Sequence, residues 1–363
     1  MAGGVVLAAG MMTASVGVAA AAPDEGCLTA GTSGFTAKVV AAAGETISRQ
    51  NIDATGCDVG IYVADGAVDV TIDRVTVTGA NGAGILAENT SHLTVQRSTV
   101  HDNGMHTQMP ASHDSYELGD LPQAFGISLF GVSDAVVTRN TVYHNGRGGI
   151  GIMDTGPFDP GHVVGQGIPL NGPVAVSNVE VSRNTLWANF NGCAIVVSAF
   201  NTDNRVSDVS ITRNTITGTQ FNLGGADVGG IVAQSNGVGS TVADITISRN
   251  TVTDSLEAGV IVHAAAPDSH TENVMVTRNT VSGNNLGYAQ PGSEVDNTVG
   301  VVVSSWLAHA DLGQSTLHTV VSRNTITGQF YGIWTQGPDA PTVDRNTIAV
   351  TDGGSAYVQA PTG

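Results

Sequence analysis

Histidine, carboxylate and arginine side chains recur in the middle of the chain, in a pattern suited to proton transfer. His101 is followed directly by Asp102, and His263 closes a short apolar run. An imidazole beside a carboxylate acts as a general acid or base near neutral pH, and an arginine orients an oxygen or a carboxylate. The alternative for each is a solvated or loop-stabilising role. The candidate catalytic residues are His263, Asp154, Arg147, His101, Asp102 and His113.

Apolar and aromatic side chains form a second candidate set, suited to holding a ligand. Rings stack on planar or ring-bearing molecules, although they also pack against loops. The candidate substrate-binding residues are Phe130, Met153, Val196, Val232, Gln234, Ile261, Val302, Trp306 and Trp334.

A repeated unit positions both sets. The tripeptide Arg-Asn-Thr occurs seven times, beginning at Arg139, Arg183, Arg213, Arg249, Arg278, Arg323 and Arg345. Weaker copies surround Arg74 and Arg97. A unit repeated at this scale predicts a solenoid. The shortest intervals between successive arginines, 22 and 23 residues, correspond to one bare coil, and longer intervals contain loops.

The residues around each copy predict strands. They alternate with period two and are rich in Val, Ile and Thr, whereas helical repeats show a 3.6-residue period. Asn tolerates the left-handed backbone conformation, so we expect it to occupy a tight bend and to form a ladder of stacked amides. The pattern over residues 55–350 resembles the right-handed parallel β-helix repeat of the pectin-lyase-like proteins.

The resemblance implies an all-β, single-stranded, right-handed parallel β-helix of about ten coils, over residues 55–363. Residues 1–22 are predicted to be a secretory signal peptide or an apolar tail, and residues 23–54 an N-terminal cap. A secreted or extracytoplasmic location fits Cys27 and Cys57, which are placed to pair in an oxidising compartment. Cys193 is expected in the core as a small hydrophobe.

Each coil is expected to have a leading strand that starts with Gly and an aliphatic residue, a middle strand that ends at the Arg-Asn bend, and a closing strand. The bend is always tight, so insertions fall at the two corners that border the leading strands. The long insertions cover residues 104–124, 154–175, 284–298 and 304–316. We expect them to wall a groove over the leading-strand sheet, where the resemblance places substrates, or else to be decoration.

Period-two alternation predicts the floor of this groove, because the neighbours of an inward aliphatic residue point outward. The first outward column is Tyr62, Leu86, Ser128, Gly151, Val196, Val232, Ile261, Val302 and Trp334. The second is Ala64, Glu88, Phe130, Met153, Ser198, Gln234, His263, Ser304 and Gln336. This floor is mostly apolar, with Glu88 as its one carboxylate. An open apolar strip indicates a ligand site unless loops lie on it and make it core.

Charge and composition exclude some partners. The net charge is −18, the chain has one lysine, Lys38, and nine of its twelve arginines lie at the repeat position. We therefore expect no nucleic-acid partner, and expect a polyanionic substrate to be repelled unless bound cations intervene. No cofactor or dedicated metal site is predicted, and calcium, although compatible with the acidity, has no residue pattern in its support. No membrane span is expected after removal of the signal, and the oligomeric state stays open.

The known chemistries of the resembled family do not map onto this chain. The β-helix polysaccharide lyases use a Lys or Arg base with calcium, but Lys38 lies in the predicted cap and only Arg147 lies by the groove. The polygalacturonases gather aspartates on adjacent leading strands, and no such cluster occurs in the outward columns. The uronan epimerases carry an Asp-Pro-His-Asp-type motif, which neither His113-Asp114 nor Asp268-Ser269-His270 matches. No catalytic residue is carried over.

Three functions remain open. The first is an exported isomerase or cyclase that encloses a largely apolar small molecule, as in specialised-metabolite biosynthesis. It is favoured by the apolar floor and by the lack of sugar-enzyme motifs. The second is a carbohydrate-active polysaccharide lyase, epimerase or glycoside hydrolase, favoured by fold analogy and export. The third is a non-catalytic surface binding protein. The ligand is accordingly a small molecule or a saccharide.

Overall fold

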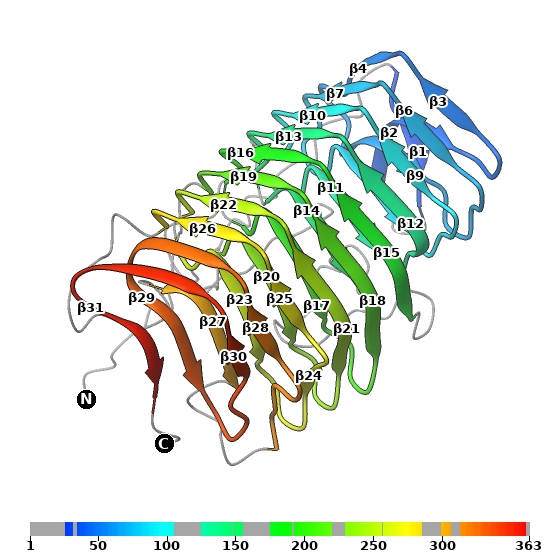
Figure 1. The fold of residues 1–363 in the computed structure, drawn as a ribbon. Helices are drawn as coiled ribbons and strands as arrows, with labels where there is room; N and C mark the ends of the chain where they lie inside the picture. Colours follow the sequence, from blue (N-terminus) through cyan, green and yellow to red (C-terminus); the bar gives the residue numbers. More distant parts are fainter. Residues whose placement is uncertain are drawn as a thin grey trace, which may run out of the picture.

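The computed structural model describes residues 26–31, 35–104, 125–146, 148–154, 175–190, 192–219, 229–255, 257–284, 299–305 and 313–360. The predicted signal segment and most of the four insertions lie outside these residues. Within the described ranges every regular element is a β-strand, and the strands stack into one solenoid (Figure 1). The predicted all-β parallel β-helix is therefore confirmed.

A single coil shows how the repeat folds. The leading strand β14 (Ile150–Met153), the middle strand β15 (Val176–Ser182) and the closing strand β16 (Thr185–Trp187) follow each other around the coil. Each pairs in parallel with the corresponding strand of the next coil, β17 (Ile195–Ala199), β18 (Arg205–Thr212) and β19 (Thr215–Thr217). The three predicted strands per coil are therefore present.

The remaining strands take the same three places. The other leading strands are β2 (Phe35–Ala41), β5 (Val59–Val63), β8 (Ile85–Glu88), β11 (Ile127–Phe130), β20 (Ile231–Ser235), β23 (Val260–Ala264) and β27 (Val299–Ser305). The other closing strands are β4 (Asn51–Asp53), β7 (Thr76–Thr78), β10 (Thr99–His101), β13 (Thr141–Tyr143), β22 (Thr251–Thr253) and β26 (Thr280–Ser282). Near the C-terminus β29 (Thr325–Gln336) and β31 (Thr347–Gln359) each continue from the closing into the leading position.

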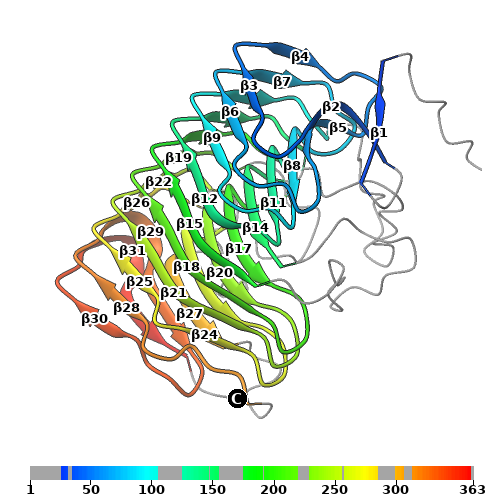
Figure 2. The ribbon, with the colours of Figure 1, turned by 90° about the vertical axis from the view of Figure 1, so that its right-hand side faces the viewer.

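The middle strands form a sheet of their own, which runs diagonally from β3 to β30 in Figure 2. Besides β15 and β18 it contains β3 (Thr46–Ser48), β6 (Thr71–Asp73), β9 (Thr94–Gln96), β12 (Ser133–Thr138), β21 (Thr241–Ser248), β25 (Met275–Thr277), β28 (Val320–Ser322) and β30 (Thr342–Asp344). A short strand, β24 (His270–Glu272), also pairs with β21.

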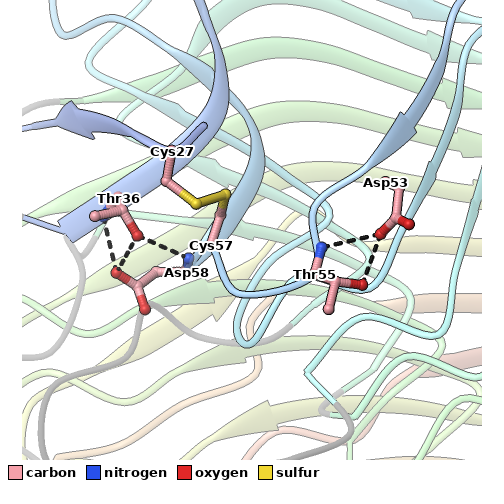
Figure 3. The surroundings of a disulfide bond; sticks show 6 residues. All are labelled: Cys27, Thr36, Asp53, Thr55, Cys57 and Asp58. Carbon is pink, nitrogen blue, oxygen red and sulfur yellow. Dashed lines mark hydrogen bonds between the residues drawn. A yellow bond between two sulfur atoms is a disulfide. The ribbon is translucent and has the colours of Figure 1, made fainter. Parts of the chain in front are cut away.

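The stack begins earlier than predicted. Strands β2, β3 and β4 pair in parallel with β5, β6 and β7, so residues 35–53 form a complete first coil rather than a cap. The antiparallel element is β1 (Leu28–Ala30), which pairs with β2. A disulfide between Cys27 and Cys57 joins the start of β1 to the corner before β5 (Figure 3). This pairing was expected from the sequence.

The Arg-Asn bend differs from its prediction in one respect. The residue with positive φ is the arginine, as at Arg139 (φ 57°) and Arg213 (φ 56°), and not the asparagine. The asparagine forms the predicted ladder: the Asn184 Nδ2 donates to the Asn214 Oδ1 at 3.0 Å, and the Asn214 Nδ2 donates to the next coil in the same way. The amide is therefore used between coils, and the left-handed turn is made by its neighbour.

A second asparagine ladder, not predicted, lies at the end of the closing strands. The Nδ2 of Asn103 donates to the Oδ1 of Asn145, and that of Asn145 donates to Asn189, each at 3.0 Å. These residues follow the first ladder position by five residues in each coil. Both ladders satisfy buried backbone carbonyls as well, for example Val142.

The interior of the solenoid is a continuous aliphatic stack. The residues that follow the leading glycines, from Ile61 to Ile333, all belong to it and are buried. The glycines are required because they approach the closing strand at the corner. A Cβ on Gly230 would collide with the Val252 side chain and approach the Gly259 carbonyl oxygen to 2.7 Å. The predicted inward register of the leading strands is therefore confirmed.

Candidate functional site

The first outward column of the leading sheet is not an open strip. All of its members except Ser128 and Gly151 belong to a separate hydrophobic cluster outside the interior stack, as the predicted alternation requires. However, Val196, Val232, Ile261, Val302 and Trp334 are each at most 8% exposed. The expectation of an exposed apolar floor is therefore wrong, because these side chains make up a second buried layer on the outer face of the sheet.

The second outward column lies beside this layer and changes character along its length. Register places Glu88, Phe130 and Met153 on adjacent strands at the N-terminal end. Phe130 and Met153 belong to the second layer and are buried, as is Glu88 beside them. The C-terminal part is polar, with successive partners Ser198, Gln234, His263, Ser304 and Gln336.

A carboxyl–phenol pair occupies the N-terminal end of the outer face. The Tyr62 hydroxyl donates to Glu88 Oε2 at 3.0 Å and accepts a hydrogen bond from the backbone N–H of Asp65 at 3.2 Å. Tyr62 stands in the first column on β5, and Glu88 stands in the second column on the next strand, β8. The phenol therefore reaches diagonally across one coil and fixes the carboxyl group beside Phe130.

Burial controls the protonation of this pair. Glu88 is 6% exposed, and burial raises its pKa to about 7, although the Tyr62 hydrogen bond opposes the rise. The nearby Asp65 carboxylate adds to the rise. Burial and the Glu88 charge raise the pKa of Tyr62, so its hydroxyl keeps its proton. Glu88 can thus exchange a proton near neutral pH, which is what a general acid or base requires.

His263 faces outward on β23, as its register predicts. It is 3% exposed, and its Nδ1 lies 3.0 Å from Ser304 Oγ on the next strand. Its carbonyl oxygen accepts a hydrogen bond from Thr271 Oγ1 at 2.6 Å. Five strand-to-strand steps separate His263 from Glu88, a distance of about 24 Å at the usual strand spacing. These two groups therefore do not act on the same bond.

The contacts of Asp154 are those of a loop anchor. Its Oδ1 accepts from the Phe200 backbone N–H at 2.7 Å, and its Oδ2 accepts from Asn201 N–H at 3.1 Å and from Asn204 Nδ2 at 2.9 Å. Burial raises its pKa against the effect of these three donors. The carboxylate ties the corner after β14 to the corner after β17, so we do not retain it in the proposed site.

His101 and Asp102 lie elsewhere, at the end of a closing strand. His101 Nδ1 is 2.7 Å from Asp102 Oδ2, and the His101 ring stacks on Tyr143 with centroids 4.7 Å apart. Tyr143 in turn stacks on Trp187 at 4.1 Å. The predicted histidine–carboxylate contact is present, but on the closing face and not beside His263 on the leading face.

The other candidates, Arg147, His113 and Trp306, lie outside the described residues. Gln234 is half-buried on β20, next to His263. No group of three or more His, Cys, Asp or Glu side chains in the described ranges is placed to hold a metal ion. Cys193 is buried, in the second layer rather than in the interior.

Comparison with known proteins identifies the family. A model of the right-handed β-helix region matches residues 39–228, which is more than half of the chain. The chain belongs to this family. No curated protein matches its sequence.

Solved structures resemble this β-helix protein in fold. The A-module of the Azotobacter vinelandii mannuronan C-5 epimerase AlgE4 has a TM-score of 0.59 at 19% identity, over 90% of this chain and 75% of that chain. The AlgE6 A-module from the same organism has a TM-score of 0.52 at 17% identity, over 90% and 78%. An exopolygalacturonase from Thermotoga maritima has a TM-score of 0.49 at 9% identity, over 83% of each chain.

Two residues of the site, Tyr62 and Glu88, were not among the candidates from sequence. Alternation had placed both in the outward columns and had marked Glu88 as the one carboxylate there. The signal in the sequence was their placement in different outward columns of neighbouring coils, from which a long side chain can reach diagonally to the other. Among the described residues of this β-helix protein no helix is long and apolar enough to cross a membrane.

Proposed function

We propose that this β-helix protein is an exported carbohydrate-active enzyme that acts on a polysaccharide at the outer face of its leading sheet. Glu88 serves as the acid or base, and Tyr62 holds it in place. The observation that carries the proposal is the buried carboxyl–phenol pair, whose carboxyl has a pKa near 7. Hydrolysis, elimination and epimerisation of a polysaccharide all need such a proton-transfer group.

The two forms of Glu88 give it two uses. As the ionised carboxylate it takes a proton from a sugar carbon or from a water molecule. As the neutral acid it gives a proton to the glycosidic oxygen that leaves. Tyr62 keeps its proton because burial and the Glu88 charge raise its pKa, and it donates to Glu88 Oε2, so it positions the carboxyl without itself exchanging a proton.

The comparisons support a saccharide over an apolar ligand. The epimerase modules with the same fold act on mannuronan by their names, although the likeness at these identities concerns the fold. The hypothesis of an isomerase or cyclase for an apolar small molecule depended on an open apolar floor. That floor is a buried layer, so an exposed apolar strip no longer favours this hypothesis.

Export is part of the proposal. The Cys27–Cys57 disulfide supports it, because such bonds persist in oxidising compartments. Polysaccharides of the cell surface or of the surroundings are then within reach of the protein.

The test is a screen of neutral and acidic polysaccharides with three readouts. New reducing ends report hydrolysis, ultraviolet absorbance of an unsaturated product reports elimination, and NMR of the recovered polymer reports epimerisation. Glu88→Gln is expected to lower turnover by about 100-fold or more, as for other acid–base groups, and Tyr62→Phe by a smaller factor. Glu180→Gln, an exposed carboxylate on the middle sheet, is the matched control and should change nothing.

Two results would refute the proposal. One is the absence of turnover on every polysaccharide offered to the wild-type protein. The other is turnover that Glu88→Gln and Tyr62→Phe leave unchanged, since the chemistry would then lie elsewhere on the molecule.

A further inference from the structure

A column of arginines runs along one corner of the solenoid, between the middle and the closing sheets. All of its members are exposed and all have positive φ. This arginine column comprises Arg49, Arg74, Arg97, Arg139, Arg183, Arg213, Arg249, Arg278, Arg323 and Arg345. Arg49 had been counted outside the repeat, and the complete first coil explains its place.

Backbone hydrogen bonds hold the column in register. The N–H of Arg139 donates to the Ser182 carbonyl of the next coil, and the N–H of Arg183 donates to Thr212, each at 3.1 Å. The same bond recurs from Arg49 to Arg323. The Cα atoms of successive arginines are therefore about 4.8 Å apart, and the ten positions span about 43 Å. Their alignment follows from the fold and not from chance proximity.

The central part of the column has no ion-pair partner within the described residues. At the N-terminal end Asp73 contacts both Arg74, at 3.1 Å, and Arg97, at 2.7 Å. At the other end Asp344 contacts Arg345 at 3.2 Å. The six arginines between these ends have no such contact: Arg139, Arg183, Arg213, Arg249, Arg278 and Arg323. The residues that precede them are Ser or Thr rather than Asp.

The bend alone does not explain arginine. A left-handed conformation costs a residue with a Cβ about 1 kcal/mol, and Gly or Asn adopts it more readily. Ten like charges in a line also repel one another. Both effects favour another residue at these positions, so the charge itself is the property that distinguishes the arginines.

Few acidic groups of the described middle strands lie close to the arginine column. Asp134, Asp208 and Asp244 form an acidic column within the middle strands β12, β18 and β21, each five residues before an arginine of the column and each with positive φ. Five residues of strand span about 16 Å, or two Debye lengths at physiological ionic strength. Glu180 is the one acidic side chain between the acidic column and the arginine column on the outer face of the middle strands, from β12 to β28. The acidic groups of the middle strands therefore do not cancel the local field of the column.

We propose that the arginine column is a binding site for a single, linear anionic polysaccharide chain. A guanidinium group binds a carboxylate or a sulfate group. A regular row of guanidinium groups can therefore bind a polymer whose anionic groups have a spacing similar to that of the arginines. Hydroxyl groups flank the column on both sides and suit sugar hydroxyls: Thr212 and Ser248 are on the middle strands, and Thr215 and Thr251 on the closing strands. A nucleic-acid duplex fits less well, because its second strand would extend toward the acidic column. This site is on a different face from the Tyr62–Glu88 pair and does not depend on the proposed activity.

The experiment measures binding of polygalacturonate, with its fully methyl-esterified form as the uncharged control. The wild-type protein is expected to bind the acidic polymer, with an affinity that falls as salt rises, and not to bind the ester. Replacing four central arginines with asparagine, which suits the backbone, removes their charge. This variant, Arg183→Asn, Arg213→Asn, Arg249→Asn and Arg278→Asn, should bind about tenfold or more weakly and with a shallower salt dependence. Lysine at the same four positions should restore binding.

Two controls make the result specific. Arg205→Asn removes an exposed arginine off the column, which pairs with Asp244 and Glu272, and should leave binding unchanged. Glu88→Gln should also leave it unchanged, so failure of the proposed activity and failure of this site are separate results. The double variants Arg183→Asn/Arg213→Asn and Arg249→Asn/Arg278→Asn give the same comparison if the fourfold variant does not fold.

Three outcomes overturn the inference. They are no binding of polygalacturonate at low salt, equal binding by wild type and the asparagine variants, and tighter binding of duplex DNA than of the polysaccharide.

Discussion

The Tyr62–Glu88 pair makes folding stability depend on pH in a way that one substitution removes. The pKa of Glu88 rises from 4.5 in the unfolded reference to about 7 in the folded protein. The folded state therefore holds the proton more tightly than the unfolded state. Its contribution to stability is fully present below pH 4.5 and is lost as the pH rises through 7. Above pH 7 the folded protein contains a buried, ionised carboxylate, which lowers its free energy of unfolding.

The shift gives the size of the effect. A difference of roughly 2.5 pKa units corresponds to about 3 kcal/mol at 1.36 kcal/mol per unit. Most of this, about 2 to 3 kcal/mol, is lost between pH 5 and pH 8. In Glu88→Gln the side-chain carbonyl still accepts the Tyr62 hydrogen bond, but no proton is exchanged. The unfolding free energy of the variant, relative to that of the wild type, should therefore rise by about 2 to 3 kcal/mol as the pH rises from 5 to 8.

The assay is chemical denaturation of both proteins at a series of pH values, followed by circular dichroism. The quantity of interest is the difference in unfolding free energy between variant and wild type, because the titration of distant groups cancels in it. Glu180→Gln, exposed on the middle sheet, is the matched control. A flat difference for Glu88→Gln, or one that falls as the pH rises, would refute the assignment of a raised pKa to Glu88.

Two further substitutions and the reduction of the disulfide test contacts that hold the coils together. Asn214→Ala removes a rung of the first asparagine ladder, leaves several buried donors and acceptors unpaired and should cost about 3 to 5 kcal/mol of unfolding free energy, whereas the exposed Thr215→Ala should cost under about 0.5. Asp154→Ala leaves three donors unpaired and should cost about 3 kcal/mol by denaturant titration; no change in midpoint would contradict its role as an anchor. Reduction of the Cys27–Cys57 disulfide, which closes a separation of 30 residues, should lower stability by about 2 to 4 kcal/mol. A Cys27→Ser variant that is insensitive to reductant and as stable as the oxidised protein would contradict this.

The fold was predictable because the features that determine a coil recur in every copy of the repeat. Each coil carries the same alternation, the same inward aliphatic residue after glycine and the same asparagine, so one register prediction settled every leading strand. The identity of the left-handed residue was not predictable in this way. Residue preferences favour Asn over Arg there, and only the demand of the amide ladder, which fixes Asn184 and Asn214 inside the bend, moves the turn to Arg183 and Arg213.

The site was harder to predict than the fold because it depends on contacts between coils. Alternation correctly turned Val232 and Ile261 outward, but outward does not mean exposed, and burial of this second layer is a property of the whole molecule. The contact between Tyr62 and Glu88 joins different columns on different strands, which a period-two pattern does not address. His101 and His263 share a residue type but lie on different faces, since one ends a closing strand and the other lies on a leading strand.

The measurement that tests the central claim most directly is the structure of this protein with a bound oligosaccharide from whichever polysaccharide it turns over. The account predicts a sugar ring on the outer face of the leading sheet, with one of its atoms within about 3 Å of the Glu88 carboxyl group. A productive sugar on the closing or the middle sheet, with Glu88 still enclosed by its protein neighbours, would contradict it.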